Sequence, residues 1–446
     1  MNTKHAMPFL LKLISLCLLA AMLLPMLPRP VSAVEGSRLT EDYEPQVAVE
    51  WMNLLYDRIE AERVSAPAAS RLYAYAGITL YEAVLHGIPG NNSLSWQVNG
   101  MEDMPFPDPE KPYNWSVVAT VAMDEVLTTF FPESEESSQA FQALRDEQLA
   151  AYNPDTISVK NSLEYGYALA EALIAWISQD QFVETRTMTY EMPSGDPALW
   201  IPTAENQRAV EPYWGQIRPF ALEYTDECAV ELNLPFSTDE NSTFYAQAME
   251  VMNTGVSLTP EQKETAEFWV DTPGITGTPA GHWVLIENQL VDQLDLTLDR
   301  AAGMYALVGI ALADSFISCW SLKYQTLLLR PESYIKQHIR PSWSPYIATP
   351  GFPAYPSGHS VVSGAAATVL TEYLGVVAFT DSSHTDSGLA PRSFTSFVAA
   401  ANEAAISRLY GGIHFRVDIE NGLIQGNCVG RRVVNRIALR PIPQGE

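Results

Sequence analysis

The sequence is poor in cysteine, with four in 446 residues. Cys17 lies in an apolar segment near the N-terminus, and Cys228, Cys319 and Cys428 are widely separated. Three cysteines at wide spacing do not form a disulfide framework, so we expect at most one bridge, and nothing in the sequence selects the pair. Three buried, unpaired thiols fit the pattern equally well.

Basic residues are also scarce, with 26 Lys and Arg against 53 Asp and Glu. Residues 1–33 hold Lys4, Lys12 and Arg29 and no acid, so the rest of the chain carries 23 basic and 53 acidic residues. Such a negative chain repels nucleic acid and anionic membrane surfaces, so we expect no nucleic-acid partner. A local cluster of basic side chains is therefore informative, because it opposes the overall charge.

Long apolar runs are confined to the N-terminus. Residues 13–27 are almost wholly apolar, follow Lys4 and Lys12, and lead to small residues that end at Ala33. This pattern is typical of a secretory signal peptide. We therefore expect residues 1–33 to be removed and the protein to be secreted, in the periplasm or outside the cell. No later segment has about 20 uninterrupted apolar residues, so no stable membrane anchor is expected.

Strand-like alternation is rare, whereas apolar residues three and four positions apart recur through most of the chain. This spacing predicts an all-α protein. Residues 180–240 have no period and contain scattered Pro, Trp and Gly, so we expect irregular chain that covers other elements. We divide the chain into an N-terminal helical region, 34–240, and a helical core, 241–446. The expected helices are 45–64, 67–87, 114–131, 137–152, 158–179, 243–256, 259–271, 299–331, 360–375 and 392–412.

The first candidate site motif is CWSLKYQTLLLRP, which contains Trp320, Lys323 and Arg330. On a continuous helix, a separation of seven residues places Lys323 and Arg330 on one face, with Trp320 one turn earlier. The neighbouring leucines and aromatics predict that this face borders a core, where two cations need an anionic partner. A solvated Lys/Arg pair at this spacing is the alternative.

The second motif is PSGH, with Ser357, Gly358 and His359. Pro356 ends the incoming loop, and Ser357 is well placed to cap the helix that follows. The free N–H groups and positive dipole end of that helix favour an anion. Gly358 allows a ligand to approach the backbone closely, and His359 can exchange a hydrogen bond with it. A plain capped helix start is the alternative.

The third motif, AISRLYGGIHFRVD, contains Arg408, His414 and Asp418. Arg408 adds a third cation. In a helical turn, Asp418 meets the His414 imidazole, fixes its tautomer and raises the basicity of the other ring nitrogen, as metal ligands and nucleophilic histidines require. A lone His–Asp pair is more often structural.

The remaining histidines lack such neighbours in the sequence. His338 and His384 have no candidate site residues near them in the sequence. His282 in TPAGHW is a candidate only for lining a pocket formed by the three motifs. The acidic segment DSSHTDSG at 381–388 lacks the spacing of an EF-hand, so we interpret it as a solvated loop rather than a calcium site.

Together, the motifs Lys-x6-Arg-Pro, Pro-Ser-Gly-His and Ser-Arg-x5-His-x3-Asp resemble the signature of the type 2 phosphatidic acid phosphatase superfamily. That superfamily contains acid phosphatases, lipid phosphatases and vanadium-dependent haloperoxidases, which share one oxyanion pocket. Trp320 before Lys323, Phe352 before the PSGH motif and the long N-terminal helical region make the chain most similar to the bacterial vanadium-dependent haloperoxidases. The resemblance implies helical bundles of the haloperoxidase and acid phosphatase type.

The same resemblance implies a vanadate cofactor with pentavalent vanadium. His414 would be its protein ligand, oriented by Asp418, and His359 and Lys323 would assist the activation of hydrogen peroxide. The donors to the vanadate oxygens would be shared among the three motifs: Lys323, Arg330, Ser357, Gly358, His359 and Arg408.

Trp320 and Phe352 would form the halide pocket. The implied reaction oxidises a halide, iodide or bromide rather than chloride, and passes the product to a small organic acceptor. The oligomeric state is not indicated. The alternative is a secreted acid phosphatase, in which His414 forms a phosphohistidine and His359 protonates the leaving alkoxide.

Overall fold

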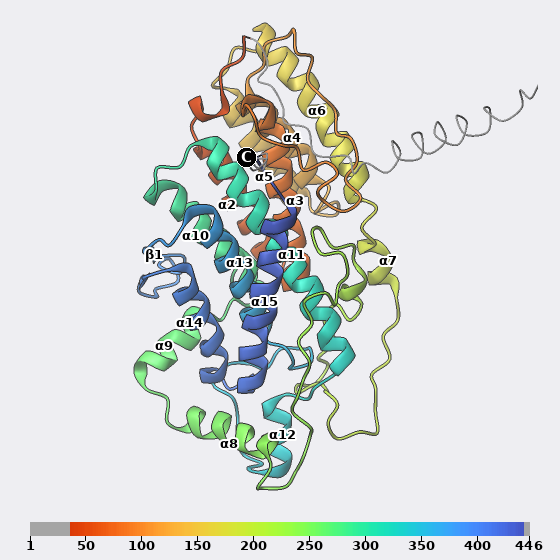
Figure 1. The fold of residues 1–446 in the computed structure, drawn as a ribbon, viewed down its shortest axis with the longest axis vertical. Helices are drawn as coiled ribbons and strands as arrows, with labels where there is room; N and C mark the ends of the chain where they lie inside the picture. The colour runs from red at the N-terminus through yellow and green to blue at the C-terminus, as the bar shows by residue number, and fades with distance from the viewer. Residues whose placement is uncertain (1–35, 441–446) are drawn as a thin grey trace, which may run out of the picture.

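A computed structural model describes residues 36–440, and the predicted signal peptide at 1–33 lies outside the described residues. Helices dominate, as predicted, and the strands named within 36–440 form one short hairpin (Figure 1). The α-helices are α2 (Gln46–Ala61), α3 (Ala66–Val84), α4 (Trp115–Thr128), α5 (Glu135–Leu149), α6 (Ile157–Ile177), α7 (Phe182–Thr187), α8 (Thr243–Val256), α9 (Pro260–Phe268), α10 (Thr278–Gln293), α11 (Leu298–Thr326), α12 (Pro331–His338), α13 (Gly358–Leu374), α14 (Phe397–Tyr410) and α15 (Arg416–Arg436). The antiparallel strands are β1 (Phe379–Asp381) and β2 (Arg392–Phe394), and 3-10 turns lie at Thr40–Asp42, Leu85–Gly87 and Trp214–Gln216.

Several predicted boundaries were wrong. The predicted helix 299–331 ends at Thr326, where Leu327 adopts a left-handed conformation and α12 begins afresh at Pro331. The predicted helix 392–412 begins with β2, so α14 starts only at Phe397. The prediction omitted α10, α12 and α15. In α15, glycine replaces apolar residues at every fourth position, which hides the helical periodicity.

The long helix α11 forms the centre of the molecule and packs along α3 on one side and against α13 and α15 on the other. In Figure 1, α4, α5 and α6 lie at the top and α8 and α12 at the bottom. A Cβ at Gly77 would lie 2.3 Å from the Tyr305 carbonyl oxygen, so glycine is required where α3 crosses α11. The division at residue 240 stays a prediction, and helices from both sides of it pack together here.

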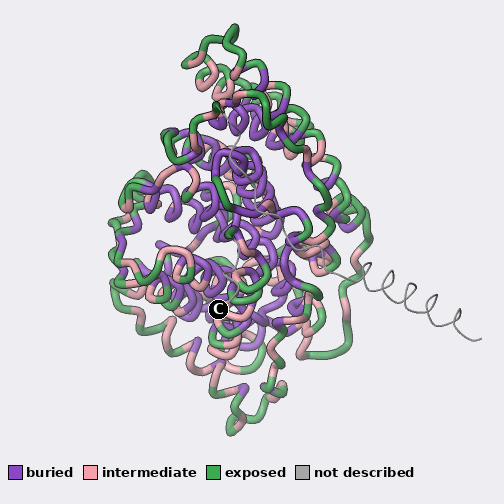
Figure 2. Tube along the Cα trace, turned by 45° about the horizontal axis from the view of Figure 1, so that its top comes forward, coloured by how far each residue is buried: buried purple, intermediate pink, exposed green. Residues whose placement is uncertain are grey.

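By length and composition α11 is apolar enough to cross a membrane, but its apolar window is entirely buried within the fold. Figure 2 shows the buried chain concentrated along the interior helices. The helix therefore serves as a core element of the described structure.

A row of glycines on α15 allows it to approach α13. Gly422, Gly426 and Gly430 face α13, and a Cβ on Gly426 would lie 2.1 Å from the Val361 carbonyl oxygen. Near the start of α13, a Cβ on Gly422 would lie 3.0 Å from the Ser357 carbonyl oxygen. This close packing fixes the N-terminus of α13 and with it the PSGH motif.

The segment 180–240 is irregular, as predicted, apart from α7 and one 3-10 turn. It is tied to the core by Asp314, whose carboxylate accepts hydrogen bonds from three consecutive backbone N–H groups at residues 220–222, at 2.6–2.9 Å. A disulfide joins Cys228 to Cys428 on α15, and Cys319 is free and buried. One bridge was the predicted maximum.

Candidate active site

The PSGH motif forms the start of α13, and the predicted cap is confirmed. Ser357 is fully buried, and its Oγ accepts hydrogen bonds from the Ser360 backbone N–H at 3.4 Å and the Ser360 hydroxyl at 2.9 Å. Gly358 and His359 are the first two residues of the helix. The positive end of α13 therefore points where the sequence predicted an anion site.

Lys323 and Arg330 do not share a helix face, contrary to the prediction. Lys323 lies in the last turn of α11, whereas Arg330 is the N-cap residue of α12. The intervening chain turns at Leu327, whose φ is 50°. Both side chains are nonetheless fully buried and lie near the same histidine, because the turn redirects Arg330 toward it.

The Lys323 ammonium is held by the loop that leads into α13. It donates to the carbonyl oxygens of Pro353 at 2.9 Å and Ala354 at 3.0 Å, and also to that of Pro356. These bonds use all three of its N–H donors. In this arrangement Lys323 therefore acts on the site through its charge and by holding the loop in place.

His414 lies in the turn between α14 and α15 and contacts both a carboxylate and a guanidinium. Its Nδ1 is 3.0 Å from Asp418 Oδ2, which also accepts the Phe415 backbone N–H at 3.0 Å. Its Nε2 is 3.1 Å from Arg330 Nη1. The predicted Asp418–His414 contact is confirmed, although His414 precedes the helix, and it fixes the proton on Nδ1 and leaves a lone pair on Nε2.

The second arginine, Arg408, is also buried and projects from the last turn of α14. Its Nε donates to Ser407 Oγ at 2.8 Å and its Nη2 to the Ala266 carbonyl at 3.2 Å. Arg330 Nε donates to the Phe352 carbonyl at 2.8 Å. Backbone and hydroxyl oxygens thus orient both guanidinium groups and leave their charge uncompensated.

Burial dominates the electrostatics of this site. It lowers the pKa of Arg330 to about 9 and that of Arg408 to about 10, and it also lowers the pKa of Lys323. Burial and the same three cations hold the pKa of His414 well below its usual range. No carboxylate of the described residues lies within ion-pairing distance of these cations, so the site favours a bound anion.

A cavity of about 540 Å³ opens beside these groups, and its wall includes His359, Arg408 and His414. Trp320 and Phe352, the two residues of the predicted halide pocket, also line this cavity, with their ring centroids 4.9 Å apart. The rest of the wall is largely apolar, with contributions from Val210, Val270, Pro279, Phe316, Ile347 and Ile413.

Comparison with known proteins agrees with this geometry. Residues 337–440 match the family model for the second helical-bundle domain of VCPO. The crystal structure described as the first bacterial vanadium-dependent iodoperoxidase is 36% identical, with a TM-score of 0.83, and the alignment covers 89% of this chain and 97% of that one. The chain belongs to the vanadium-dependent haloperoxidases.

Two other members of this family are more distant. A holo-type bacterial vanadium-dependent chloroperoxidase shares the fold, with a TM-score of 0.61, 15% identity and coverage of 84% of this chain and 93% of that one. Vanadium chloroperoxidase of Curvularia inaequalis is 27% identical, but the match covers only 26% of this chain and 23% of that protein.

The oxyanion site, defined here as Lys323, Arg330, Ser357, Gly358, His359, Arg408 and His414, fits the vanadate of a haloperoxidase. Arg330 Nη2 is buried without a hydrogen-bond partner in the described structure. His359 Nε2 also forms no hydrogen bond there, although it lies 3.4 Å from Asp271 Oδ2. Buried donors, three cations and an imidazole nitrogen that carries no proton are the groups that a metal oxyanion requires.

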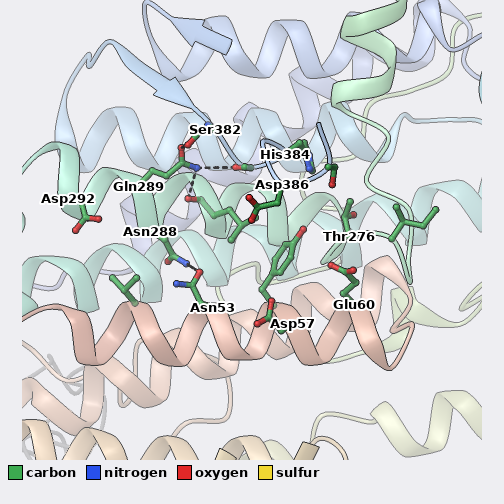
Figure 3. A pocket seen from close by; sticks show the side chains of 16 residues that line it. Asn53, Asp57, Glu60, Thr276, Asn288, Gln289, Asp292, Ser382, His384 and Asp386 are labelled. Carbon is green, nitrogen blue, oxygen red and sulfur yellow. Dashed lines mark hydrogen bonds between the residues drawn. The ribbon is translucent and has the colours of Figure 1, made fainter. Parts of the chain in front are cut away.

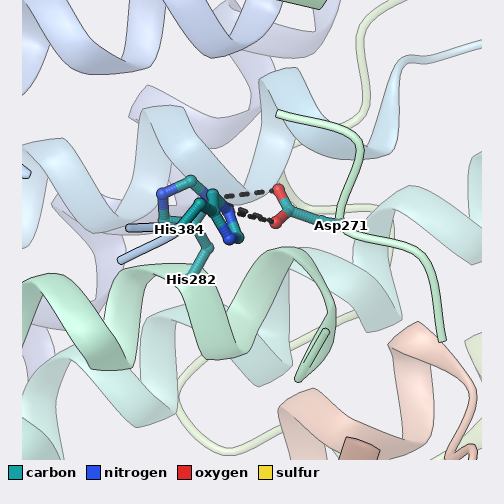
Figure 4. Close-up of side chains that lie close together, drawn as sticks. All are labelled: Asp271, His282 and His384. Carbon is teal, nitrogen blue, oxygen red and sulfur yellow. Dashed lines mark hydrogen bonds and ion pairs between the residues drawn. The ribbon is translucent and has the colours of Figure 1, made fainter. Parts of the chain in front are cut away.

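The sequence analysis missed a second polar group, the Asp–His cluster, which consists of Asp271, His282, Asp381 and His384. His282 lies between two carboxylates, with Nδ1 3.1 Å from Asp271 Oδ1 and Nε2 2.8 Å from Asp381 Oδ2. Figure 4 shows His282 and His384 side by side, facing Asp271. His282 therefore contacts a cavity-lining residue and is not among the cavity-lining residues itself.

The segment 381–388 is only partly the solvated loop that we predicted. Asp381 and His384 are buried, whereas the residues after His384 are exposed. His384 also lines a second cavity, of about 570 Å³, with Asp57, Glu60 and Asp386 (Figure 3). The four cluster residues come from three separate segments, so no local motif indicated them.

Proposed function

We propose that this chain is a vanadate-dependent peroxidase that uses hydrogen peroxide to oxidise iodide to hypoiodous acid. The similarity to a bacterial iodoperoxidase along 97% of that protein's length supports iodide over other halides. Bromide is the next candidate, and a small organic molecule is the acceptor of the oxidised halogen.

One observation carries this proposal. Three cations, Lys323, Arg330 and Arg408, are fully buried around a neutral His414 and lack carboxylate partners among the described residues. Leaving three such charges uncompensated is costly, so the site is built for an anion with several oxygens. Bound vanadate supplies a Lewis acid that activates hydrogen peroxide for attack by the halide.

His414 would offer its Nε2 lone pair to vanadium in place of the contact with Arg330 Nη1, because Asp418 holds the proton on Nδ1. Arg330, Arg408 and Ser357 would hold the oxygens, together with the Gly358 amide at the positive end of α13. Lys323 adds positive charge and fixes the loop that carries Phe352.

We assign the transfer of a proton to His359. It lines the cavity, and burial and Arg408 lower its pKa to about 4, so its imidazole is neutral at neutral pH and can accept a proton from peroxide. Asp271, 3.4 Å from Nε2, can then stabilise the imidazolium. Trp320 and Phe352 provide the apolar wall for a weakly hydrated halide.

We also propose that the protein works outside the cytoplasm. The predicted signal peptide at 1–33 supports this location, and so does the Cys228–Cys428 disulfide, since such bonds persist in oxidising compartments. N-terminal sequencing of the protein recovered from outside the cytoplasm should give a chain that begins after Ala33.

A paired assay tests the activity. The chelator-treated protein should be inactive and should regain peroxide-dependent iodide oxidation when orthovanadate is added. Its hydrolysis of p-nitrophenyl phosphate should be negligible by comparison. Robust phosphatase activity that vanadate inhibits, without halide oxidation under any condition, would instead identify the acid phosphatase.

A further inference from the structure

We propose that Asp271, His282 and His384 form a zinc site, separate from the oxyanion site. Their ligand atoms all lie within 4.8 Å of one another, and the three residues are buried. None of the motifs that predicted the oxyanion site includes them, and the inference does not depend on the proposed activity.

The three ligand atoms form a triangle of the right size. His282 Nδ1 is 3.1 Å from Asp271 Oδ1, His384 Nε2 is 3.4 Å from His282 Nδ1, and His384 Nε2 is 3.5 Å from Asp271 Oδ1. A tetrahedral zinc ion with ligands at about 2.0–2.1 Å has edges of about 3.3–3.4 Å between ligand atoms. The triangle therefore supplies three corners of a zinc tetrahedron.

The chemistry of the donors also matches zinc. Two imidazole nitrogens and one carboxylate oxygen form a common three-ligand set, which leaves one coordination position open. The facing ring nitrogens of His282 and His384 lie 3.4 Å apart, and both lie close to Asp271 Oδ1, so a cation among them would contact all three ligand atoms. A divalent ion would also offset the two buried carboxylates, Asp271 and Asp381.

Asp381 orients His282 from the opposite side of the ring. Its Oδ2 is 2.8 Å from His282 Nε2, and its Oδ1 accepts the Ser383 backbone N–H at 2.9 Å and hydroxyl at 2.6 Å. A carboxylate behind a histidine is the usual support of a zinc ligand, because it fixes the tautomer that presents the other nitrogen to the metal.

Aromatic rings fix the two histidines and shield them. Trp269 stacks on His282 with centroids 4.3 Å apart, and Phe268 meets His384 edge-on at 5.2 Å. His384 in turn lines the second cavity, whose wall includes Asp57 and Glu60 (Figure 3). That acidic wall provides an entry path that attracts a cation.

Metal analysis of the purified full-length protein, freed of any affinity tag, tests the site. We expect one zinc per chain in wild type and in His338→Ala, which removes an exposed histidine of α12. His384→Ala should lose the zinc while it still binds vanadate. X-ray absorption should show nitrogen and oxygen ligands at about 2.0–2.1 Å and no sulfur.

Added zinc should raise the melting temperature of the metal-stripped wild type and of His338→Ala but not that of His384→Ala. A stripped wild-type chain that binds no zinc at micromolar free metal overturns the proposal, whether or not the variants fold. Equal zinc content in wild type and His384→Ala overturns it as well, since the metal would then bind elsewhere. The cluster would in that case be a hydrogen-bonded ion network.

Discussion

The oxyanion site and the Asp–His cluster are neighbours, with His359 of the first 3.4 Å from Asp271 of the second, and they have opposite charge. The oxyanion site surrounds His414 with three cations and supports it with Asp418. The cluster surrounds His282 with two carboxylates, and Asp271 and Asp381 raise the pKa of His282 to about 10 against the effect of burial. One site is built for an anion and the other for a proton or a cation.

The two sites use the same supporting device. A carboxylate holds one nitrogen of the key histidine in each, at 3.0 Å for Asp418 and His414 and at 2.8 Å for Asp381 and His282. The groups around the other ring nitrogen differ: cations surround that of His414, and Asp271 faces that of His282. This difference decides which kind of ligand each site binds. A histidine–carboxylate pair alone therefore does not identify a site, because its neighbours decide whether an anion or a cation binds.

His414→Ala should give the largest effect and should separate the two sites. It removes the imidazole whose Nε2 is proposed to bind vanadium, so vanadate retention and iodide oxidation should both be lost. Zinc content should stay at the wild-type level, because His414 is not a ligand of the Asp–His cluster. Elemental analysis after dialysis measures both metals, and stoichiometric vanadium in the variant would exclude His414 as the ligand.

Lys323→Ala should lower turnover by about 10²–10³-fold, the usual effect of removing one group that stabilises charge in the transition state. Vanadate affinity should fall less, because Arg330, Arg408 and His414 remain. The melting temperature should also fall, since the carbonyl oxygens of Pro353, Ala354 and Pro356 lose their donor.

Saturated rates, vanadate dissociation constants and melting temperatures for Lys323→Ala test these roles, with Lys336→Ala on α12 as the control. If the variant binds vanadate less tightly but turns over normally at saturating vanadate, Lys323 only helps to hold the vanadate through its charge and has no role in turnover.

The sequence predicted the residues of the oxyanion site but not those of the Asp–His cluster, and this difference has a physical cause. Ser357, Gly358 and His359 signal their role locally, because a cap, a glycine and an imidazole at a helix start have a fixed geometry. The Asp–His cluster has no such signal, since Asp271 and His384 meet only after α10, α11 and α13 have packed.

The prediction of the helices shows the same difference between local and tertiary signals. Amphipathic helices such as α2 and α8 were predicted nearly to the residue, because their spacing is a local property. The break after Thr326 was missed, since leucines continue the apolar pattern through a left-handed turn. Lys323 and Arg330 still act on the same residue, His414, but tertiary packing places them there and not the shared helix face that we predicted.

Asp418→Asn and Asp381→Asn test whether the two supporting carboxylates act independently. Each change should weaken the ligand of its own site by about 10–100-fold, the usual effect of losing such support. Vanadate should bind less tightly to Asp418→Asn, and zinc less tightly to Asp381→Asn. Dissociation constants for both ligands on both variants provide the test, and a large cross-effect would show that the sites are coupled through Asp271 and His359.

Ser357→Ala should give the smallest effect, and a matched control separates its two roles. Ser357 caps α13, and Ser396 caps α14 in the same way, accepting the Ala399 N–H at 3.1 Å. Either change to alanine should cost about 0.5–2 kcal/mol of stability, the usual cost of losing a cap. Only Ser357→Ala should also weaken vanadate binding, by about fivefold, which corresponds to one hydrogen bond of about 1 kcal/mol. Denaturant unfolding and vanadate titration on both variants measure these effects, and unchanged vanadate affinity in Ser357→Ala would leave Ser357 with a capping role alone.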